Sequence, residues 1–343
     1  MRTVSMKKWK ICLACGIVLF SLSLSVATAQ SPQKVITWGF APSSASATPG
    51  SSYHKYIMEP FADLINADTN GRLKLIIHKG LVPDSRVIEG VRDGTVEMGA
   101  QIVQFRAELP LLGFIVLPFI PHEKLPEIAK QMKPTFSKLL SEKHDVVLLG
   151  YGYFPKQRLV TKKPIRTVED MKGYKMRVSS TESLELFKAA GANPVFLPMS
   201  EVYPALQRGV IDGGVTSLEG VISKKWYEVL KYIYDWPMGN AAYIWIANKK
   251  SWATLPSDLQ KQILKAFEDK YEMGTFEGTY EEDARYQREL ESLGMKFGKP
   301  EPGEVEKYLA NTPPILAKWK ERVGPGADEM IAVINKALGT NYK

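Results

Sequence analysis

Most of the chain alternates between short β-prone runs and amphipathic helical segments, and this alternation constrains the fold more than any other feature. Lys34–Phe40 is a strand-like run, Tyr53–Asn66 carries apolar residues on a 3.6-residue period, and Arg72–His78 is strand-like again. Strands that alternate with helices form βαβ units and largely parallel sheets, so we expect an α/β fold. The pattern predicts further elements at Ser85–Asp93, Val96–Gln101, Glu123–Leu140, Val146–Tyr153, Tyr174–Val178, Thr181–Ala190, Pro194–Leu197, Glu201–Gly209 (with Ser200 as its N-cap), Ile211–Val215 and Ile222–Leu230.

The region after Pro256 has a different pattern. Ser257–Leu293 contains no proline, and its apolar residues recur at helical spacing throughout. One helix of about 37 residues would be roughly 55 Å long at 1.5 Å per residue, which is longer than a small lobe. We therefore predict a helix that connects two lobes. The alternative is two helices that are separated near Gly274 and Gly278.

The first 29 residues have the three parts of a secretory signal peptide. A basic start with Arg2, Lys7, Lys8 and Lys10 precedes the apolar run Ile11–Val26. The small-x-small sequence at residues 27–29 then predicts cleavage before Gln30 and export to the periplasm. The alternative is an uncleaved membrane anchor, because Ile11–Ala29 is just long enough to span a bilayer.

Both cysteines, Cys12 and Cys15, lie within this signal, so the mature chain is expected to have no disulfide, thiolate metal site or cysteine nucleophile. Removal of 29 residues from 343 leaves 314, which is enough for two lobes. Removal of the four signal charges from 45 Lys and Arg leaves 41 against 37 Asp and Glu, a net charge of +4. This mild and interspersed charge argues against nucleic acid as a partner.

Sequence motifs for catalysis are missing. The four histidines, His54, His78, His122 and His144, form no HExxH pair, and each is expected to be a surface or core residue. The chain also has no GxSxG nucleophile elbow, no Walker loop and no GxGxxG turn. We therefore expect a binding protein rather than an enzyme, with no metal and no cofactor.

Three segments carry a family resemblance: Pro164–Val178 (PIRTVEDMKGYKMRV), Ala190–Val195 (AGANPV) and Met199–Gly213 (MSEVYPALQRGVIDG). Their order and spacing resemble the DctP-type solute receptors of TRAP transporters, the tripartite carriers that work without ATP. The resemblance covers nearly all of the mature chain. Shorter pieces agree with it: Asn70–Leu73, Gly90–Met98, Leu117–Phe119, Trp226–Val229 and Asn248–Lys249.

The resemblance implies a two-lobed periplasmic-binding-protein fold of type II-like, Venus-flytrap architecture, with a long helix that spans both lobes. The lobe boundaries expected from it place residues 30–155 and 243–282 in the first lobe. Residues 156–242 and 283–343 then form the second lobe. The ligand is expected to bind in the cleft between the lobes.

The resemblance also implies the ligand anchor. In this family an arginine in a KxRV-like strand pairs with the ligand carboxylate, and Arg177 occupies that position. Its planar guanidinium matches a carboxylate and stays charged at any working pH. Arg158 matches a second arginine that lines the cleft in many members, where it either contacts the same carboxylate or supports Arg177. Without the resemblance, Arg177 would be expected to form an ordinary surface salt bridge.

The sequence departs from the family after Asp212-Gly213. Many relatives continue with an asparagine that contacts the ligand, whereas this chain has Thr216 followed by Ser217. Both hydroxyls can still donate hydrogen bonds, but the amide is lost.

Further candidates come from strand ends, because ligands of open α/β sheets lie beyond the carboxyl ends of the strands. The aromatic members suggest an apolar pocket, and with the lost amide they slightly favour a monocarboxylate with an apolar or aromatic tail. These candidates are Ser43, Ser44, Gln104, Phe105, Tyr153, Phe154, Tyr243 and Trp245.

The sequence thus predicts a monomeric periplasmic receptor that closes on a small organic acid and docks on the permease subunits of a TRAP transporter. A receptor of the same fold that serves a sensor is the first alternative. A secreted hydrolase is the second, and it lacks a recognisable nucleophile or base.

Overall fold

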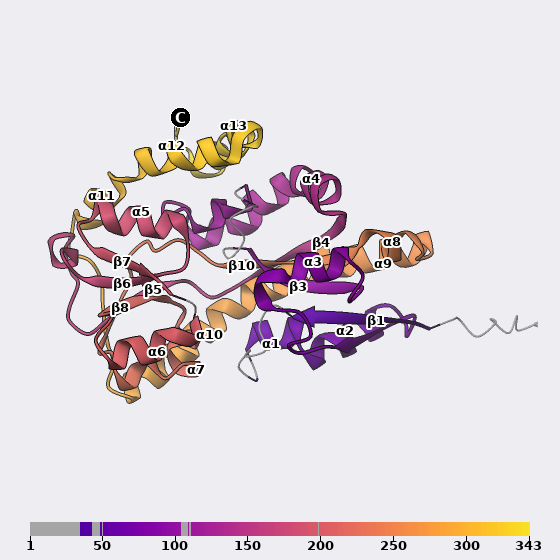
Figure 1. The fold of residues 1–343 in the computed structure, drawn as a ribbon, viewed down its shortest axis with the longest axis horizontal. Helices are drawn as coiled ribbons and strands as arrows, with labels where there is room; N and C mark the ends of the chain where they lie inside the picture. The colour runs from indigo at the N-terminus through magenta and orange to yellow at the C-terminus, as the bar shows by residue number, and fades with distance from the viewer. Residues whose placement is uncertain (1–34, 43–48, 50, 104–108, 110, 198) are drawn as a thin grey trace, which may run out of the picture. The chain divides into compact units, whose positions relative to one another are not determined.

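The computed structural model describes residues 35–42, 49, 51–103, 109, 111–197 and 199–343, and Val35–Lys343 form one compact unit. Two β-sheets organise this unit (Figure 1). The first sheet has the strand order β2-β1-β3-β10-β4. Its strands are β1 (Ile36–Pro42), β2 (Leu73–Ile77), β3 (Met98–Ile102), β4 (Val146–Tyr153) and β10 (Ala242–Asn248).

The second sheet has the order β11-β9-β5-β8-β6-β7. The chain enters it after β4 and returns to the first sheet at β10 through two segments without helix or strand, and it crosses again to β11 along a long helical segment. The strands of this sheet are β5 (Arg158–Thr161), β6 (Lys175–Val178), β7 (Asn193–Phe196), β8 (Gly213–Thr216), β9 (Tyr232–Tyr234) and β11 (Lys296–Gly298).

The α/β fold is confirmed, and the sheets are mixed. β10 runs antiparallel to both β3 and β4, and β5 runs antiparallel to both β8 and β9. Both antiparallel strands directly follow a crossing between the sheets. All seven residues of β10 are buried, as expected for a strand that is covered on both faces.

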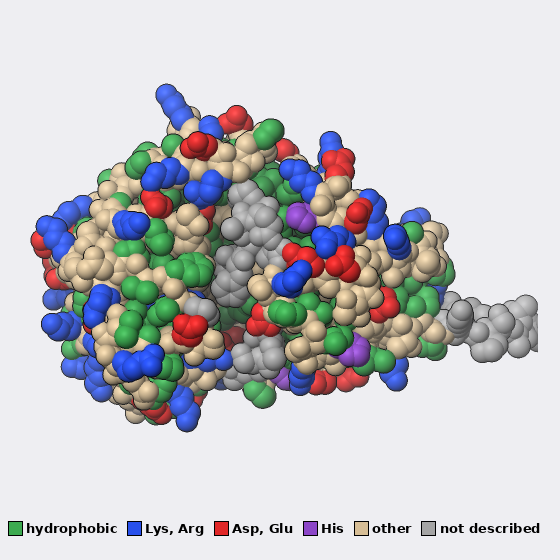
Figure 2. All heavy atoms as spheres, in the orientation of Figure 1, with side chains coloured by type: hydrophobic (Ala, Val, Ile, Leu, Met, Phe, Trp, Pro, Cys, Tyr) green, Lys and Arg blue, Asp and Glu red, His purple; other side chains and the backbone are tan. Residues whose placement is uncertain are grey.

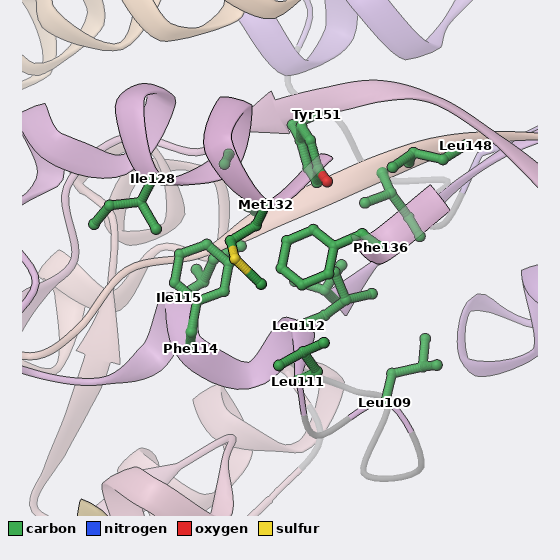
Figure 3. Packing of buried hydrophobic residues seen from close by; sticks show 14 of the residues in the cluster. Leu109, Leu111, Leu112, Phe114, Ile115, Ile128, Met132, Phe136, Leu148 and Tyr151 are labelled. Carbon is green, nitrogen blue, oxygen red and sulfur yellow. The ribbon is translucent and has the colours of Figure 1, made fainter. Parts of the chain in front are cut away.

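Apolar clusters cover both faces of each sheet. In the largest cluster, α4 and a 3₁₀ turn at Leu112–Val116 pack on β4, where Phe114 and Phe136 stack at 5.8 Å (Figure 3). The helices are α1 (Ser52–Ile57), α2 (Glu59–Asp68), α3 (Val87–Arg92), α4 (Leu125–His144), α5 (Thr181–Ala189), α6 (Met199–Gln207), α7 (Leu218–Ser223), α8 (Lys249–Ala253), α9 (Ser257–Ala266), α10 (Glu272–Ser292), α11 (Glu304–Leu309), α12 (Thr312–Val323) and α13 (Ala327–Leu338).

Three helix predictions need correction. The segment Tyr53–Asn66 is two helices, because Met58 is extended and Pro60, which has no N–H, lies at the start of α2. Helix α6 begins at Met199, so Ser200 lies inside its first turn and is not its N-cap. The segment Ile222–Leu230 holds only the end of α7 and a 3₁₀ turn.

The long connecting helix is confirmed. Helices α9 and α10 are joined by a π-helical turn at Phe267–Tyr271 without an interruption, and Gly274 and Gly278 lie within α10. Tyr271 belongs to a core cluster of the first sheet, whereas Leu290 belongs to one of the second sheet. Figure 1 shows α10 passing from one sheet toward the other.

The C-terminal helix packs differently from the expected lobe grouping. Met330 and Ile331 of α13 are buried with Phe136 of α4 in the largest cluster of the first sheet, although residues 283–343 were expected in the second lobe. Helix α12 lies between the two groups, because it contacts both α5 and α13. The remaining lobe boundaries stay a prediction.

No helix among the described residues combines the length and apolar character that a membrane crossing requires. On the face seen in Figure 2, Lys and Arg side chains are interspersed with Asp and Glu. This distribution agrees with the mild net charge of residues 30–343.

Candidate functional site

Arg177 lies on β6, the strand next to the β7 edge of the second sheet, and is only 2% exposed. It belongs to β6, between β7 and β8, where the residue opposite it on β8 is Gly214. A Cβ at Gly214 would lie 3.1 Å from the Cβ of Arg177, so the glycine leaves room for the long side chain. The guanidinium donates from Nε to the carbonyl of Leu197 at 3.0 Å and from Nη1 to that of Val215 at 3.4 Å.

No carboxylate of the described residues forms an ion pair with Arg177. Its known partners are neutral carbonyl groups. Burial lowers the pKa of Arg177 to about 10, so the guanidinium remains charged at neutral pH. Arg177 therefore does not form the surface salt bridge that would be expected without the family resemblance. It is a buried cation that donates to two backbone carbonyls.

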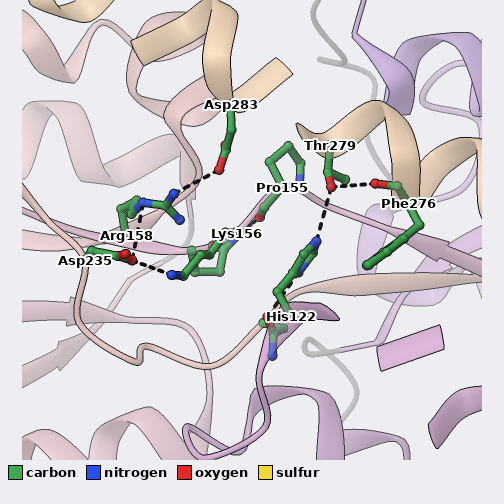
Figure 4. A network of polar contacts seen from close by, with 10 residues as sticks. His122, Pro155, Lys156, Arg158, Asp235, Phe276, Thr279 and Asp283 are labelled. Carbon is green, nitrogen blue, oxygen red and sulfur yellow. Dashed lines mark hydrogen bonds and ion pairs between the residues drawn. The ribbon is translucent and has the colours of Figure 1, made fainter. Parts of the chain in front are cut away.

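Arg158 has different surroundings. Its Nη2 donates to Oδ2 of Asp283 on α10 at 2.9 Å, and its Nε lies 3.7 Å from Oδ1 of Asp235 (Figure 4). Lys156 also pairs with Asp235, at 2.6 Å. Burial raises the pKa of Asp283, and the nearby Arg158 opposes that rise. Two protein carboxylates therefore lie near Arg158, whereas its Nη1 is buried and has no hydrogen-bond partner among the described residues. Both roles predicted for Arg158, contact with the ligand and support of Arg177, stay predictions.

Thr216 and Ser217 end β8 and begin α7. Thr216 is buried and pairs with Arg158 across the sheet. A Cβ at Gly220 would lie 2.2 Å from the Thr216 hydroxyl oxygen, so this hydroxyl packs directly against α7. The Ser217 hydroxyl is the N-cap of α7 and accepts from the Gly220 N–H at 3.1 Å. Ser217 thus has a local structural role that the sequence interpretation missed.

The predicted aromatic residues separate onto two faces of the first sheet. Tyr153 belongs to the cluster that contains α4, and its ring meets Phe276 edge to face at 5.5 Å. Tyr243 belongs to the cluster on the other face, where its ring lies 5.4 Å from that of Phe154. Trp245 is a core residue whose indole N–H donates to the Tyr56 carbonyl. Ser43, Ser44, Gln104 and Phe105 lie outside the described residues.

A small cavity of about 20 Å³ lies beside these groups. Its lining includes Gln157, Ser180, Val215 and Ala241, which come from both sheet crossings and from the second sheet. The cavity has room for about one water molecule. A larger solute needs movement of the surrounding segments, which a hinge between the two sheets can supply.

One polar group in this region escaped the sequence interpretation. His122 is 6% exposed, and its Nδ1 lies 3.2 Å from Oδ1 of Asn240 while its Nε2 lies 3.2 Å from the Thr279 hydroxyl (Figure 4). Burial is the main cause that lowers its pKa to about 4. The imidazole thereby connects the segment before β10 to the long helix. A lone histidine between prolines and charges has no sequence pattern that would reveal this contact.

Among the described residues, no group of three or more His, Asp or Glu side chains is arranged to hold a metal ion.

The sequence model of the family described as bacterial extracellular solute-binding protein, family 7 (DctP) matches residues 43–322. The chain is 27% identical over 286 residues to the C4-dicarboxylate-binding periplasmic protein DctP of Rhodobacter capsulatus, covering 81% of this chain and 84% of the relative. A TRAP periplasmic solute-binding protein from Ochrobactrum anthropi has a TM-score of 0.80 at 25% identity, over 90% of this chain and 98% of that one. A Bordetella pertussis extracytoplasmic solute receptor binding pyroglutamic acid has a TM-score of 0.77 at 24% identity, over 87% and 99%. The chain therefore belongs to the DctP family of solute-binding proteins, the extracytoplasmic receptors of TRAP transporters.

Proposed function

We propose that this receptor binds one small organic acid in the cleft between its two sheets, with Arg177 as the carboxylate anchor. The observation that carries the proposal is the buried guanidinium without a carboxylate partner among the described residues. A buried cation is costly unless it is paired and hydrogen-bonded. A ligand carboxylate would supply the missing charge in the bidentate geometry that arginine favours.

The protein is exported through its cleaved signal peptide and acts as a monomer. Binding draws the two sheets together, and the closed form docks on the membrane permease of a TRAP transporter. The ligand is a monocarboxylate with an apolar or aromatic tail. Two features support this choice: the loss of the ligand-contacting amide at Thr216 and the aromatic side chains Phe154 and Tyr243 beside the crossings.

A calorimetric screen of carboxylic acids, each paired with its neutral amide, tests the anchor. Wild-type protein is expected to bind at least one acid and none of the amides. Arg177→Met is expected to weaken binding by about 2–5 kcal/mol, as when one partner of a buried charge pair is removed. The variant should still fold, because it removes an unpaired buried charge.

The matched control is Arg166→Met, because Arg166 pairs with Glu301 at the surface and its side chain is 61% exposed. This variant is expected to bind like wild type. Wild-type affinity in Arg177→Met would remove Arg177 from the site. A screen that returns only dicarboxylates or sugar acids would refute the monocarboxylate preference and leave the anchor intact.

A further inference from the structure

On the face of the first sheet that α1 and α2 cover, two tyrosine hydroxyls have no hydrogen-bond partner among the described residues. They are the hydroxyls of Tyr53, a residue that is 7% exposed, and of Tyr243, which is 0% exposed. Buried tyrosine hydroxyls usually find a partner, and an unsatisfied one lowers stability. Each of these hydroxyls is therefore a donor that a bound molecule can use.

The two tyrosines form a compact group with Phe154, which we call the aromatic triad. The ring of Tyr53 lies 4.5 Å from that of Phe154 and 4.9 Å from that of Tyr243. The third distance, from Phe154 to Tyr243, is 5.4 Å. Gly152 makes room for the group, because a Cβ there would lie 2.1 Å from Cζ of Tyr243 and 2.5 Å from its hydroxyl oxygen.

The aromatic triad lies at the edge where ligands of α/β sheets bind. Phe154 directly follows β4, and Tyr243 stands opposite Ile102, the last residue of β3. Tyr53 comes from α1, the first helix after β1. The carboxyl ends of β3 and β4 therefore meet at this group, as the strand-end rule requires.

A short chain of contacts joins the aromatic triad to the anchor. The Phe154 N–H donates to the Ala241 carbonyl at 3.1 Å, and Ala241 lines the small cavity together with Val215. The Val215 carbonyl in turn accepts from Arg177. The cavity is thus lined by a backbone partner of the guanidinium, Val215, and by a backbone partner of the aromatic triad, Ala241.

Both hydroxyls are donors at neutral pH. Burial, followed by the nearby charges of Asp84 and Glu219, raises the pKa of Tyr53 well above its ordinary value. Burial likewise raises the pKa of Tyr243. Glu219 belongs to α7, whose Leu218 and Val221 are buried in a core cluster of the second sheet.

We infer that the aromatic triad recognises the end of the ligand remote from its carboxylate, and that this end is a flat, unsaturated group with a hydrogen-bond acceptor. A ring carbonyl, a lactam or a heteroaromatic nitrogen has this chemistry. The rings provide a face for a flat group, and the two hydroxyls donate to its acceptor. The inference rests on the proposed function, because it assumes that Arg177 holds the carboxylate.

Such a site is expected to distinguish strongly between ligands with and without the acceptor atom. A pocket whose polar groups are built to hydrogen-bond a ligand rejects an analogue without the matching atom, because those groups are then left unsatisfied. A purely apolar pocket cannot make that distinction. Matched acids that differ only by an acceptor therefore measure the role of the hydroxyls.

The experiment compares three pairs of acids by calorimetry: nicotinate with benzoate, pyroglutamate with cyclopentanecarboxylate, and 4-acetylbenzoate with 4-ethylbenzoate. In at least one pair, wild-type protein is expected to bind the acceptor-bearing acid about ten-fold or more tightly than its partner. Tyr53→Phe and Tyr243→Phe are each expected to lose most of that preference and to bind the partner acid within about two-fold of wild type. Both variants should melt at the wild-type temperature or higher.

Tyr151→Phe is the matched control. Its hydroxyl is also buried and without a partner among the described residues, but its ring packs against Phe136 in the cluster on the other face of the sheet. This variant is expected to keep the wild-type preference.

Several results would overturn the inference. It falls if wild-type protein binds both members of every pair equally, or if the preference survives in both tyrosine variants. A lower melting temperature in both variants would show that the hydroxyls have structural partners. In each of these cases, the proposed function still holds if wild-type protein binds an acid and Arg177→Met weakens that binding. If no carboxylic acid binds at all, the proposed function fails and the inference fails with it.

Discussion

Arg177 and Arg158 show how the fold gives the same side chain different surroundings. Arg158 meets Asp283 and Asp235, so two carboxylates lie near its charge. Arg177 meets only the carbonyls of Leu197 and Val215 among the described residues. In the sequence both are arginines in short β-prone runs. The difference depends on which carboxylates the fold brings near each one.

At the residue scale, the burial of His122 also predicts that the free energy of unfolding depends on pH. The pKa of His122 in the folded state is about 4, against about 6.5 in the unfolded chain, mainly because the ring is buried. Glu123 raises this pKa, whereas Arg158 and Lys156 lower it. Between these two pH values the unfolded chain binds the proton and the folded chain does not. The contribution of neutral His122 to the free energy of unfolding is therefore fully present above pH 6.5 and is lost as the pH falls toward 4.

The expected loss is about 1.4 kcal/mol per pH unit below 6.5, or roughly 2 kcal/mol by pH 5. Urea unfolding at pH 7.5, 6.5, 5.5 and 5.0 measures it, in a range where most carboxylates do not titrate. His122→Gln cannot take up this proton, and its free energy of unfolding is expected to vary less over the same range. Equal slopes in the two proteins would show that the histidine does not titrate as inferred.

At the scale of elements, one face of the long helix contacts three other parts of the chain. Thr275 accepts from the Tyr153 N–H at 3.2 Å, Thr279 meets His122, and Asp283 meets Arg158. These three residues are four apart and therefore share one face of α10. The same face thus touches the end of β4, the turn at His122 and the start of β5. This face of α10 therefore connects elements of the first sheet to the start of the second.

The ion pair between Arg158 and Asp283 is predicted to stabilise the fold. Asp283→Asn leaves an amide acceptor at this position and makes Asp235, at 3.7 Å, the one carboxylate near Arg158 among its described ion pairs. We expect a loss of about 1–3 kcal/mol in the free energy of unfolding, because a cation left poorly paired in a buried place is costly. Asp328→Asn is the control, since this side chain is 87% exposed beside Lys320 and its change should cost less than about 1 kcal/mol. A similar small effect in both variants would mean that Arg158 does not depend on Asp283.

Gly274 permits the close approach of α1 to α10. Alanine in a helix interior is usually favoured over glycine by about 1 kcal/mol. At this position, however, a Cβ would lie 2.2 Å from the Tyr56 hydroxyl oxygen and 2.9 Å from its Cζ. Gly274→Ala is therefore expected to lower the free energy of unfolding by about 1–3 kcal/mol.

A double-mutant cycle with Tyr56→Phe isolates the clash at Gly274, because it removes the nearest atom. The loss caused by Gly274→Ala should be smaller in the Tyr56→Phe background. Stabilisation by Gly274→Ala alone would show that α1 moves aside without cost. The glycine that the sequence suggested as a helix break is thus a site of close packing within a continuous helix.

For the molecule as a whole, the signal peptide expected at residues 1–29 makes a direct prediction. Protein expressed in full length in a Gram-negative host should appear in the periplasm as a chain of 314 residues that begins at Gln30. Intact mass spectrometry of the periplasmic fraction checks this. Ala29→Lys removes the small residue before the expected cleavage site and should leave the chain uncleaved in the membrane fraction. A wild-type chain that keeps residues 1–29 would instead identify them as an anchor.

Much of the fold was predictable because local pattern determined it. The predicted strand Val146–Tyr153 coincides with β4, and the long helix follows from uninterrupted periodicity. Strand β10 was missed as an element because a strand buried on both faces has no alternating pattern. The antiparallel direction of β10 and β5 was missed because it depends on where each crossing segment enters its sheet. The packing of α13 on α4 joins residues about 200 apart, a distance that no local pattern spans.

By itself, the sequence determined the class of this protein. The predicted signal peptide, the strand–helix alternation and the family segments each depend on residues near one another in the chain, and so does the position of Arg177 in its strand. Only the tertiary structure decided what surrounds that arginine, which of the aromatic candidates lie together, and that Tyr53 joins them. These properties depend on burial and on contacts between distant segments. The charge balance of a side chain and the hydrogen bonding of a hydroxyl are set by neighbours that only folding brings together.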